Sequence, residues 1–363
     1  MNDFRAEPPA LREAMLDAVR RVLGSGWYVL GPEVEAFEQE WASVCGLPYA
    51  VGVGNGMDAI EIALRALDIG PGDEVITTSM TAFATVLAVL RAGATPVLAD
   101  IAPDTALLGP ESVARCVTGR TRVVLLVHLY GQVRGMDAWA SFCAAHGIAL
   151  IEDCAQAHLA TSRDRVAGSF GAAGAYSFYP TKNLGAAGDA GMLVTRNETL
   201  ARRARHLRNY GQTVRYHHPE VGLNSRLDEI HAAILLERLR WLPAFTARRR
   251  QLAGAYRSEI RSPYVHQLVE PDEPSSHVYH LYVITCDHRD ALQAHLQRHG
   301  VQTLIHYPIP VHWQKPCLAL NRDPTGLTHS ERHAATCLSL PCYPWMSDAD
   351  LEQVVAAVNS FRG

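Results

Sequence analysis

The stretch Ser177-Phe-Tyr-Pro-Thr-Lys-Asn-Leu-Gly-Ala-Ala-Gly-Asp189 places one lysine, Lys182, among glycines, small residues and hydroxyls. Of the 33 basic residues only Lys182 and Lys315 are lysines, so arginine supplies nearly every other positive charge. A guanidinium stays protonated, whereas a lysine amine can lose its proton and attack a carbonyl to form a Schiff base. Lys182 is therefore a candidate for covalent attachment of a carbonyl cofactor, and the alternative is an ordinary surface lysine.

The composition restricts the class of protein. A chain of 363 residues suggests two domains, and a charged fraction of 19% favours a homo-oligomer, in which a partner subunit covers apolar surface. The net charge of -4 offers no broad positive field, so nucleic acid is not an expected partner. No long apolar run predicts a membrane segment, and no signal core precedes Pro9. The eight cysteines lack a C-x-x-C pair, which predicts buried thiols in a reducing cytoplasm and neither disulfides nor a metal site.

Short apolar runs alternate with helical stretches along the first half of the chain. This rhythm predicts an α/β fold with a mostly parallel sheet. We expect a large domain over residues 1–245, with N-terminal helices, and a smaller α+β domain over residues 246–363. The expected strands are Tyr49–Val53, Glu74–Thr78, Thr95–Ala99, Arg122–Val127, Ile148–Glu152 and His277–Thr285, and the later helices are Arg226–Leu242, Pro243–Arg257, Arg289–His299 and Asp348–Phe361, with a linker over Pro263–Pro274.

The segment Val51-Gly-Val-Gly-Asn-Gly-Met-Asp-Ala59 ends one expected strand and opens a helix. Backbone amides near Gly56 and Met57 would face a phosphate there, with the positive end of the helix dipole behind them. The dinucleotide-binding pattern would need a glycine in place of Met57, and no lysine follows as in a P-loop. A turn with purely structural glycines is the other interpretation.

Two acids, Glu152 and Asp153, end the strand that begins at Ile148. A carboxylate at this edge of an α/β sheet could keep a pyridine nitrogen protonated and so make the ring an electron sink, or it could cap a helix or form an ion pair. Phe83 could lie over a flat ring or fill the core, and Ser177 could add a hydroxyl to a phosphate site.

Five motifs together resemble the DegT/DnrJ/EryC1/StrS nucleotide-sugar aminotransferases, which are fold type I pyridoxal phosphate enzymes. They are Glu152-Asp-Cys-Ala-Gln-Ala-His158, Ser177-Phe-Tyr-Pro-Thr-Lys-Asn-Leu-Gly185, Arg208-Asn-Tyr-Gly211, Asn224-Ser-Arg-Leu-Asp-Glu229 and His306-Tyr-Pro-Ile-Pro-Val-His312. The resemblance covers nearly the whole chain. One departure concerns the residue after Thr81, which is usually aromatic in the family and is Ala82 here, with Phe83 following.

The resemblance implies a set of roles for the cofactor site. Lys182 would form the Schiff base, Asp153 would pair with the pyridine nitrogen, and Gln156 would lie beside the 3-hydroxyl. The phosphate would be held by Gly56, Met57 and Ser177, and by Asn224 of the neighbouring subunit, so that a homodimer shares its active sites. The residues expected to contact substrate are Tyr179, Arg226, His306, Tyr307 and His312.

The resemblance also implies the reaction. L-glutamate would donate its amino group to C-3 of a dTDP-linked 3-keto-6-deoxyhexose in a ping-pong mechanism. Amination at C-4 of a 4-keto sugar is the runner-up, and a cofactor-binding regulator without turnover is a more distant alternative. Some relatives carry histidine in place of the lysine and dehydrate their substrate, and Lys182 argues against that reaction here.

Overall fold

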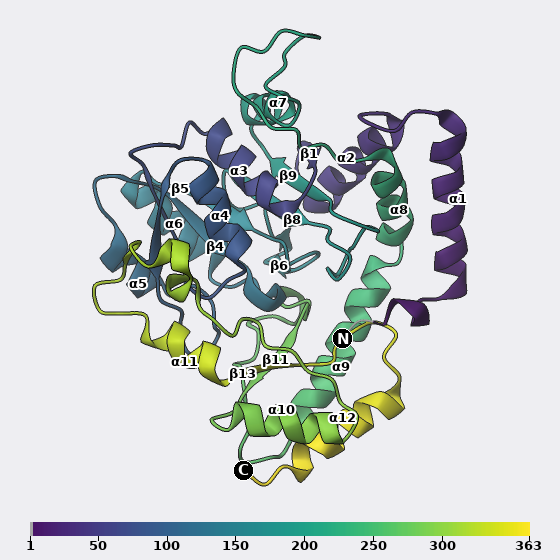
Figure 1. Ribbon diagram of the computed structural model, residues 1–363, viewed down its shortest axis with the longest axis vertical. Helices are drawn as coiled ribbons and strands as arrows, with labels where there is room; N and C mark the ends of the chain where they lie inside the picture. The colour runs from purple at the N-terminus through teal and green to yellow at the C-terminus, as the bar shows by residue number, and fades with distance from the viewer. Residues whose placement is uncertain (1–2) are drawn as a thin grey trace.

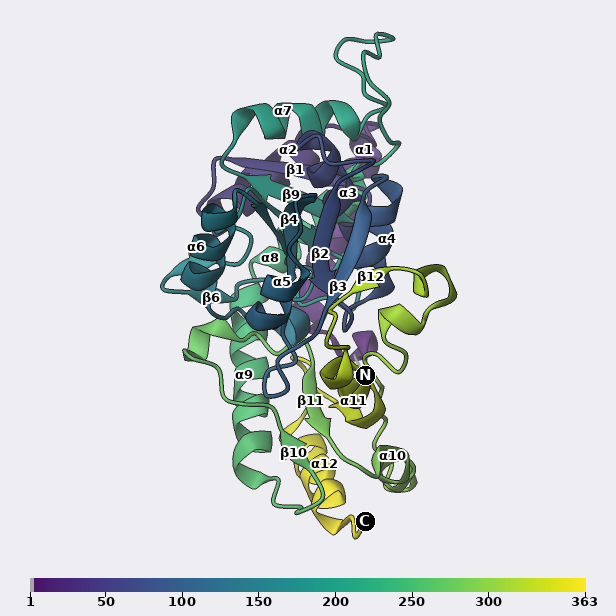
Figure 2. The same cartoon turned by 90° about the vertical axis from the view of Figure 1, so that its left-hand side faces the viewer.

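The computed structural model describes residues 3–363, which form a large unit around an extended sheet and a smaller unit around a short sheet (Figures 1 and 2). The large sheet has eight strands in the order β1-β9-β8-β5-β4-β2-β3-β12. The strands from β8 to β12 in this order pair in parallel, and β9 runs antiparallel to both β1 and β8. The strands are β1 (Tyr49–Val53), β2 (Glu74–Thr78), β3 (Thr95–Ala99), β4 (Thr121–Val127), β5 (Ala149–Asp153), β8 (Ala173–Ser177), β9 (Gly191–Thr195) and β12 (Asn321–Arg322).

Helices cover both faces of the large sheet, because its central strands are apolar on both sides. One core contains side chains of α2, α5, α6 and α8, and the opposite core contains side chains of α3, α4 and α7. Helix α1 packs outside α8 through Ala18, Val22 and Ala233. The helices are α1 (Pro9–Ser25), α2 (Pro32–Cys45), α3 (Gly56–Ala66), α4 (Phe83–Arg91), α5 (Pro110–Cys116), α6 (Met136–His146), α7 (Glu198–Leu207) and α8 (Glu229–Leu239).

The smaller unit has its own apolar core, built from α9, α10, α12 and a three-stranded sheet in the order β10-β11-β13. Helix α9 descends from the large unit into this core in Figure 2. The expected boundary between residues 245 and 246 falls inside α9, and the division of the chain at that point stays a prediction. The remaining elements are β6 (Thr161–Ser162), β7 (Arg165–Val166), α9 (Leu242–Glu259), β10 (His266–Gln267), β11 (Tyr282–Thr285), α10 (Arg289–Arg298), α11 (Thr328–Thr336), β13 (Cys337–Leu340) and α12 (Asp348–Ser360).

The fold confirms the predicted α/β class with a mostly parallel sheet, and three of the predicted strands, β1, β2 and β3, have the expected bounds. Two predictions placed element starts three or more residues too early, and the strand expected from Ile148 begins one residue later, at Ala149. Helix α8 begins at Glu229 rather than Arg226, because Asp228 has an extended backbone and serves as its N-cap. Strand β11 begins at Tyr282 rather than His277, because Tyr279 has a φ of 46°, which interrupts an extended run.

The eight cysteines are buried and unpaired, as the sequence predicted. Within residues 3–363 there is no helix with both the length and the apolar character needed to span a bilayer.

Candidate active site

Lys182 lies in the turn that follows β8, in the sequence that joins this strand to β9. The backbone N–H of Lys182 donates to the carbonyl of Tyr179 at 2.8 Å, which fixes the start of the turn. Burial lowers the pKa of the Lys182 amine from 10.5 to about 8, although the charge of Asp153 acts in the opposite direction. More of this amine is therefore neutral and nucleophilic near neutral pH than in an ordinary lysine.

Asp153 is the last residue of β5 and is buried. Its Oδ2 accepts a hydrogen bond from the Thr85 hydroxyl at 2.8 Å, and its Oδ1 accepts one from the backbone N–H of Ala155 at 3.1 Å. The Thr85 hydroxyl also contacts the hydroxyl of Thr81 at 2.9 Å. These bonds orient the carboxylate, and the contribution of Thr85, in the first turn of α4, was not predicted from the sequence.

Glu152, the residue before Asp153, is instead occupied by hydrogen bonds within the protein. Its carboxylate accepts hydrogen bonds from the backbone N–H groups of Gly168 at 2.7 Å, Phe170 at 2.7 Å and Gly171 at 2.9 Å, and it contacts His128 Nε2 at 2.9 Å. Successive side chains of a strand point to opposite faces, so only one of the two acids can face the site. The hydrogen bond of Asp153 with Thr85 and the effect of its charge on Lys182 favour Asp153 as that acid, and its role toward a cofactor stays a prediction.

The N-terminus of α3 forms a cup of backbone donors. Asn55 caps the helix, and its Oδ1 accepts from the N–H of Asp58 at 2.8 Å. The N–H groups of Gly56 and Met57 belong to the first turn, where a helix provides no carbonyl partner. A Cβ added to Gly56 would lie 2.7 Å from the Cβ of Ser177, so the cup sits directly against the end of β8. This concave set of amides suits a phosphate group.

Gln156 connects the large unit to Tyr307. Its Oε1 accepts from the backbone N–H of Tyr130 at 2.6 Å, and its Nε2 donates to the Tyr307 hydroxyl at 3.3 Å. Burial, and then the charge of Asp153, raise the pKa of Tyr307 to about 12. Tyr307 therefore lies near both Gln156 and Asp153 and keeps its hydroxyl hydrogen at neutral pH.

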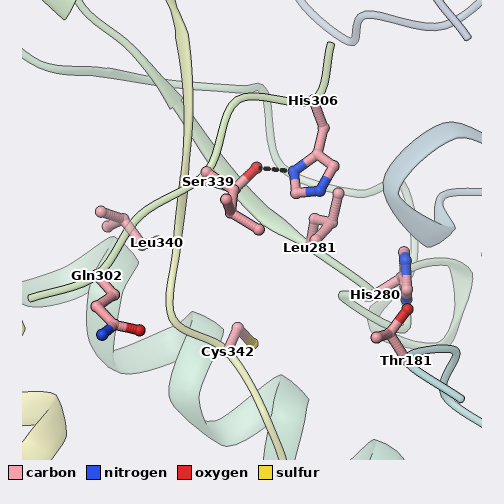
Figure 3. A pocket seen from close by; sticks show the side chains of 9 residues that line it. Thr181, His280, Leu281, Gln302, His306, Ser339, Leu340 and Cys342 are labelled. Carbon is pink, nitrogen blue, oxygen red and sulfur yellow. Dashed lines mark hydrogen bonds between the residues drawn. The ribbon is translucent and has the colours of Figure 1, made fainter. Parts of the chain in front are cut away.

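The two histidines of the last motif lie in different surroundings. His306 lines a pocket beside Thr181, and its Nδ1 contacts the Ser339 hydroxyl at 2.8 Å (Figure 3). His312 is 1% exposed, and its two ring nitrogens contact Ser79 Oγ at 2.6 Å and Glu331 Oε1 at 3.0 Å. Protein atoms occupy both nitrogens of His312, so its predicted contact with substrate has no support from this geometry.

The other predicted residues lie at the border of the site or on the surface. Phe83 packs partly against an apolar cluster that contains Val86 and Leu98, and its stacking on a ring stays a prediction. Tyr179 and Asn224 are exposed. Arg226 donates to Asn209 Oδ1 at 3.2 Å and lies over the ring of Tyr210 at 5.2 Å.

The segment that carries Asn224 and Arg226 reaches the cup of its own chain. The hydroxyl of Ser225, between these two residues, accepts from the N–H of Gly54 at 2.9 Å. Gly54 lies two residues before Gly56, so this segment packs against the loop that leads into α3. The predicted contact of Asn224 with the phosphate of a neighbouring subunit, and the roles of Arg226 and Tyr179 toward substrate, stay predictions.

Taken together, the site offers a half-buried lysine, an oriented carboxylate and a set of backbone donors at the carboxyl edge of a parallel sheet. The chain belongs to the DegT/DnrJ/EryC1/StrS aminotransferase family, whose model matches residues 9–359. It is thus an aminotransferase of this family, as the motifs predicted, and its α/β fold is the fold of that family's solved members.

Individual relatives are similar along their whole length. The chain is 45% identical to the erythromycin biosynthesis sensory transduction protein EryC1 of Saccharopolyspora erythraea, over 99% of this chain and 98% of that protein. It is 44% identical to dTDP-3-amino-3,4,6-trideoxy-alpha-D-glucose transaminase of Streptomyces venezuelae, over 99% of this chain and 95% of that protein. The crystal structure of S. venezuelae DesV in complex with a ketimine intermediate superposes with a TM-score of 0.95 at 43% identity, covering 98% of this chain and 96% of that one.

Proposed function

We propose that this protein is a pyridoxal phosphate-dependent aminotransferase that transfers the amino group of L-glutamate to C-3 of a dTDP-linked 3-keto-6-deoxyhexose. The observation that carries the proposal is the half-buried Lys182 in the turn after β8, whose pKa is lowered to about 8 by desolvation against the opposing charge of Asp153. An amine in this state can attack a carbonyl and later accept a proton, which an arginine could not do.

The residues present fit the cofactor. A Cβ on Gly56 would lie 2.7 Å from the Cβ of Ser177, so glycine allows the start of α3 to pack against the end of β8 and brings the amides of Gly56 and Met57 close to the Ser177 side chain, where they would hold the phosphate. Lys182 would hold the aldehyde end, Asp153 the ring nitrogen, and Gln156 the neighbourhood of the ring hydroxyl. The bound cofactor supplies a carbonyl carbon for the amino nitrogen and an electron-withdrawing ring.

The chain's own residues supply the proton transfers and the electrostatics. The Lys182 amine would accept a proton from the donor's α-carbon and later deliver a proton to the sugar carbon that receives the nitrogen. The Asp153 carboxylate, held by Thr85 at 2.8 Å, stabilises positive charge on the ring nitrogen. Because the donor would leave its nitrogen behind and depart as 2-oxoglutarate before the sugar binds, we expect ping-pong kinetics.

The choice of C-3 rests on the relatives. The S. venezuelae relative is 44% identical, and its name describes a transaminase of a dTDP-linked 3-amino sugar. The regulator alternative deserves a direct test, because the similar S. erythraea protein bears the name of a sensory transduction protein.

We further propose that the catalytic unit is a homodimer in the cytoplasm. Exposed apolar side chains gather near the segment that carries Asn224. Trp27 is 57% exposed and Tyr28 49% exposed, and the backbone carbonyl of Tyr28 accepts from the N–H of Glu229. A partner subunit would cover this surface and bring Asn224 toward the neighbouring phosphate.

A two-step assay tests the proposal. The purified, cofactor-loaded protein is first incubated with L-glutamate, and 2-oxoglutarate is measured by mass spectrometry. The aminated enzyme is then given dTDP-3-keto and dTDP-4-keto sugars separately, and the product is located by NMR. Oxoglutarate and a 3-amino sugar are the expected products. Absence of oxoglutarate would support a binding protein, and a product aminated only at C-4 would replace the C-3 proposal.

A further inference from the structure

A pocket without an acidic residue in its lining opens beside the turn that carries Lys182 (Figure 3). Thr181, the residue before Lys182, forms part of one side, and His306 and Ser339 form part of another. The lining does not include Asp153, Gln156 or Ser177, so the pocket is a neighbour of the proposed cofactor site rather than the same space. Three leucines contribute apolar walls: Leu281, Leu304 and Leu340.

A buried cation lies directly behind this pocket. Nη1 of Arg249, on α9, donates to the backbone carbonyls of His280 at 3.2 Å and Cys342 at 2.5 Å, and both of these residues line the pocket. Arg249 is 2% exposed, its Nε has no hydrogen-bond partner, and among residues 3–363 no acidic side chain forms an ion pair with it. A guanidinium keeps its charge when buried, so the wall carries positive charge that the protein does not neutralise.

The two imidazoles of the lining, those of His280 and His306, are neutral, so Arg249 is the source of the positive charge at this wall. Burial, and then the charge of Lys182, lower the pKa of His306 to about 4, and the same two causes lower that of His280 well below its usual value. Thr181, which precedes Lys182, also lines the pocket, so the pocket adjoins the turn that carries the reacting amine. When the Ser339 hydroxyl donates to Nδ1 of His306, Nε2 of this ring carries the hydrogen and is a donor.

We propose that this pocket binds the side-chain carboxylate of a dicarboxylic amino donor, glutamate, and of its 2-oxo acid product. The inference rests on the proposed function and adds the place where the donor is recognised. An acid-free lining with positive charge behind it favours an anion, and the leucines match the methylene groups that separate the two carboxylates.

The diphosphate of a nucleotide sugar is the other anion that the reaction brings near Lys182. Diphosphates in proteins are usually held by arginine or lysine side chains in direct contact, and the nine lining residues include neither. A single carboxylate, with one negative charge, is the better match to one buried guanidinium and neutral donors.

The test introduces a like charge at the rim of the pocket. Gln302 lines the pocket and is exposed, so Gln302→Glu places a carboxylate there without disturbing the core. Gln297→Glu, on the exposed side of α10, makes the same change outside the pocket and is the matched control. Holoenzymes are compared by the rate of the glutamate half-reaction, by the rate of the keto-sugar half-reaction, and by calorimetric binding of glutarate, which carries two carboxylates and no amine.

We expect Gln302→Glu to raise the glutamate KM by about tenfold and to weaken glutarate binding by a similar factor, through repulsion in a partly buried site. The control and the keto-sugar half-reaction should stay within about twofold of the wild type. An unchanged glutamate KM, or a loss confined to the keto-sugar half-reaction, overturns the proposal.

A second comparison excludes a general structural effect. With glutamine as donor, which has the length of glutamate without its negative charge, the KM should change much less in Gln302→Glu than it does with glutamate. Equal losses for both donors overturn the proposal. If the wild type converts no amino donor, the proposed function is wrong. If the wild type turns over normally and Gln302→Glu is unaffected, the proposed function stands and only the assignment of the pocket to the donor carboxylate is wrong.

Discussion

Gln156 donates a hydrogen bond from Nε2 to the hydroxyl of Tyr307 at 3.3 Å. The direction of this bond is determined by the other end of the amide, because Oε1 of Gln156 accepts from the backbone N–H of Tyr130, which can only donate. One acceptor position of the Tyr307 oxygen is thereby filled, and its own O–H remains available as a donor. The surrounding site would therefore use Tyr307 as a positioned hydroxyl rather than as a base.

Removal of this hydroxyl tests that role. For Tyr307→Phe we expect turnover to fall by about tenfold and the pH titration of the bound cofactor's visible absorbance to shift by about one unit, because a hydrogen-bond donor near the ring is lost. The surface variant Tyr264→Phe is the control, since Tyr264 is 38% exposed. A titration curve identical to that of the wild type would contradict a role near the cofactor.

Replacement of Lys182 by arginine keeps the positive charge and removes the amine that can form a covalent link. Lys182→Arg should keep the fold and lose turnover by more than about 10³-fold, together with the visible absorbance of the lysine-bound cofactor, because arginine cannot form the covalent link. Lys315 is exposed and is the only other lysine of the chain, so Lys315→Arg is the matched control and should behave like the wild type. Turnover retained in Lys182→Arg would exclude this residue as the base.

The pKa of Lys182 predicts a pH dependence of stability in the cofactor-free protein. Its folded value of about 8 lies below the ordinary value of 10.5, so between these limits the unfolded chain binds more protons than the folded one. The stability of the wild type relative to Lys182→Met should therefore rise as the pH increases from about 8 to 10.5, as the cost of burying the charged amine disappears. Urea denaturation at several pH values measures this difference, and a difference that falls across the window would contradict the lowered pKa.

Thr85 is predicted to position Asp153. Thr85→Ala removes the hydroxyl that donates to Oδ2 at 2.8 Å and should lower kcat by about tenfold, whereas Thr85→Ser should restore most of it. Equal losses in the alanine and serine variants would indicate a packing effect of the methyl group instead.

Gly56→Ala tests the phosphate cup. The new Cβ would lie 2.7 Å from Ser177 Cβ, so the helix start must move away from β8. We expect the dissociation constant of pyridoxal phosphate to rise by at least about tenfold, from loss of aligned amide donors. Gly24→Ala is the control, because a Cβ there has nothing within 4 Å. Unchanged cofactor affinity in Gly56→Ala would locate the phosphate elsewhere.

Local patterns predicted much of the fold, since β1, β2 and β3 are short apolar runs with clear turn residues at their ends. The roles of Glu152 and Asp153 could not be separated in this way, because the direction of each side chain depends on which face of β5 meets α4. Thr85 was missed for a similar reason: its contact with Asp153 spans 68 positions of sequence and follows from how the strands are ordered in the sheet. His312 was grouped with His306 by motif, but one of its partners, Ser79, lies 233 positions away in the sequence, and the other, Glu331, lies on α11.

The short strand β12 joins the edge of the large sheet by pairing in parallel with β3, although it follows the small sheet's first two strands in sequence. Truncation after residue 245 would strip this cover and leave the backbone groups of β3 open to pairing with another chain. The N-terminal fragment should thus self-associate when expressed alone. In the full chain, the pairing of β12 with β3 prevents this association.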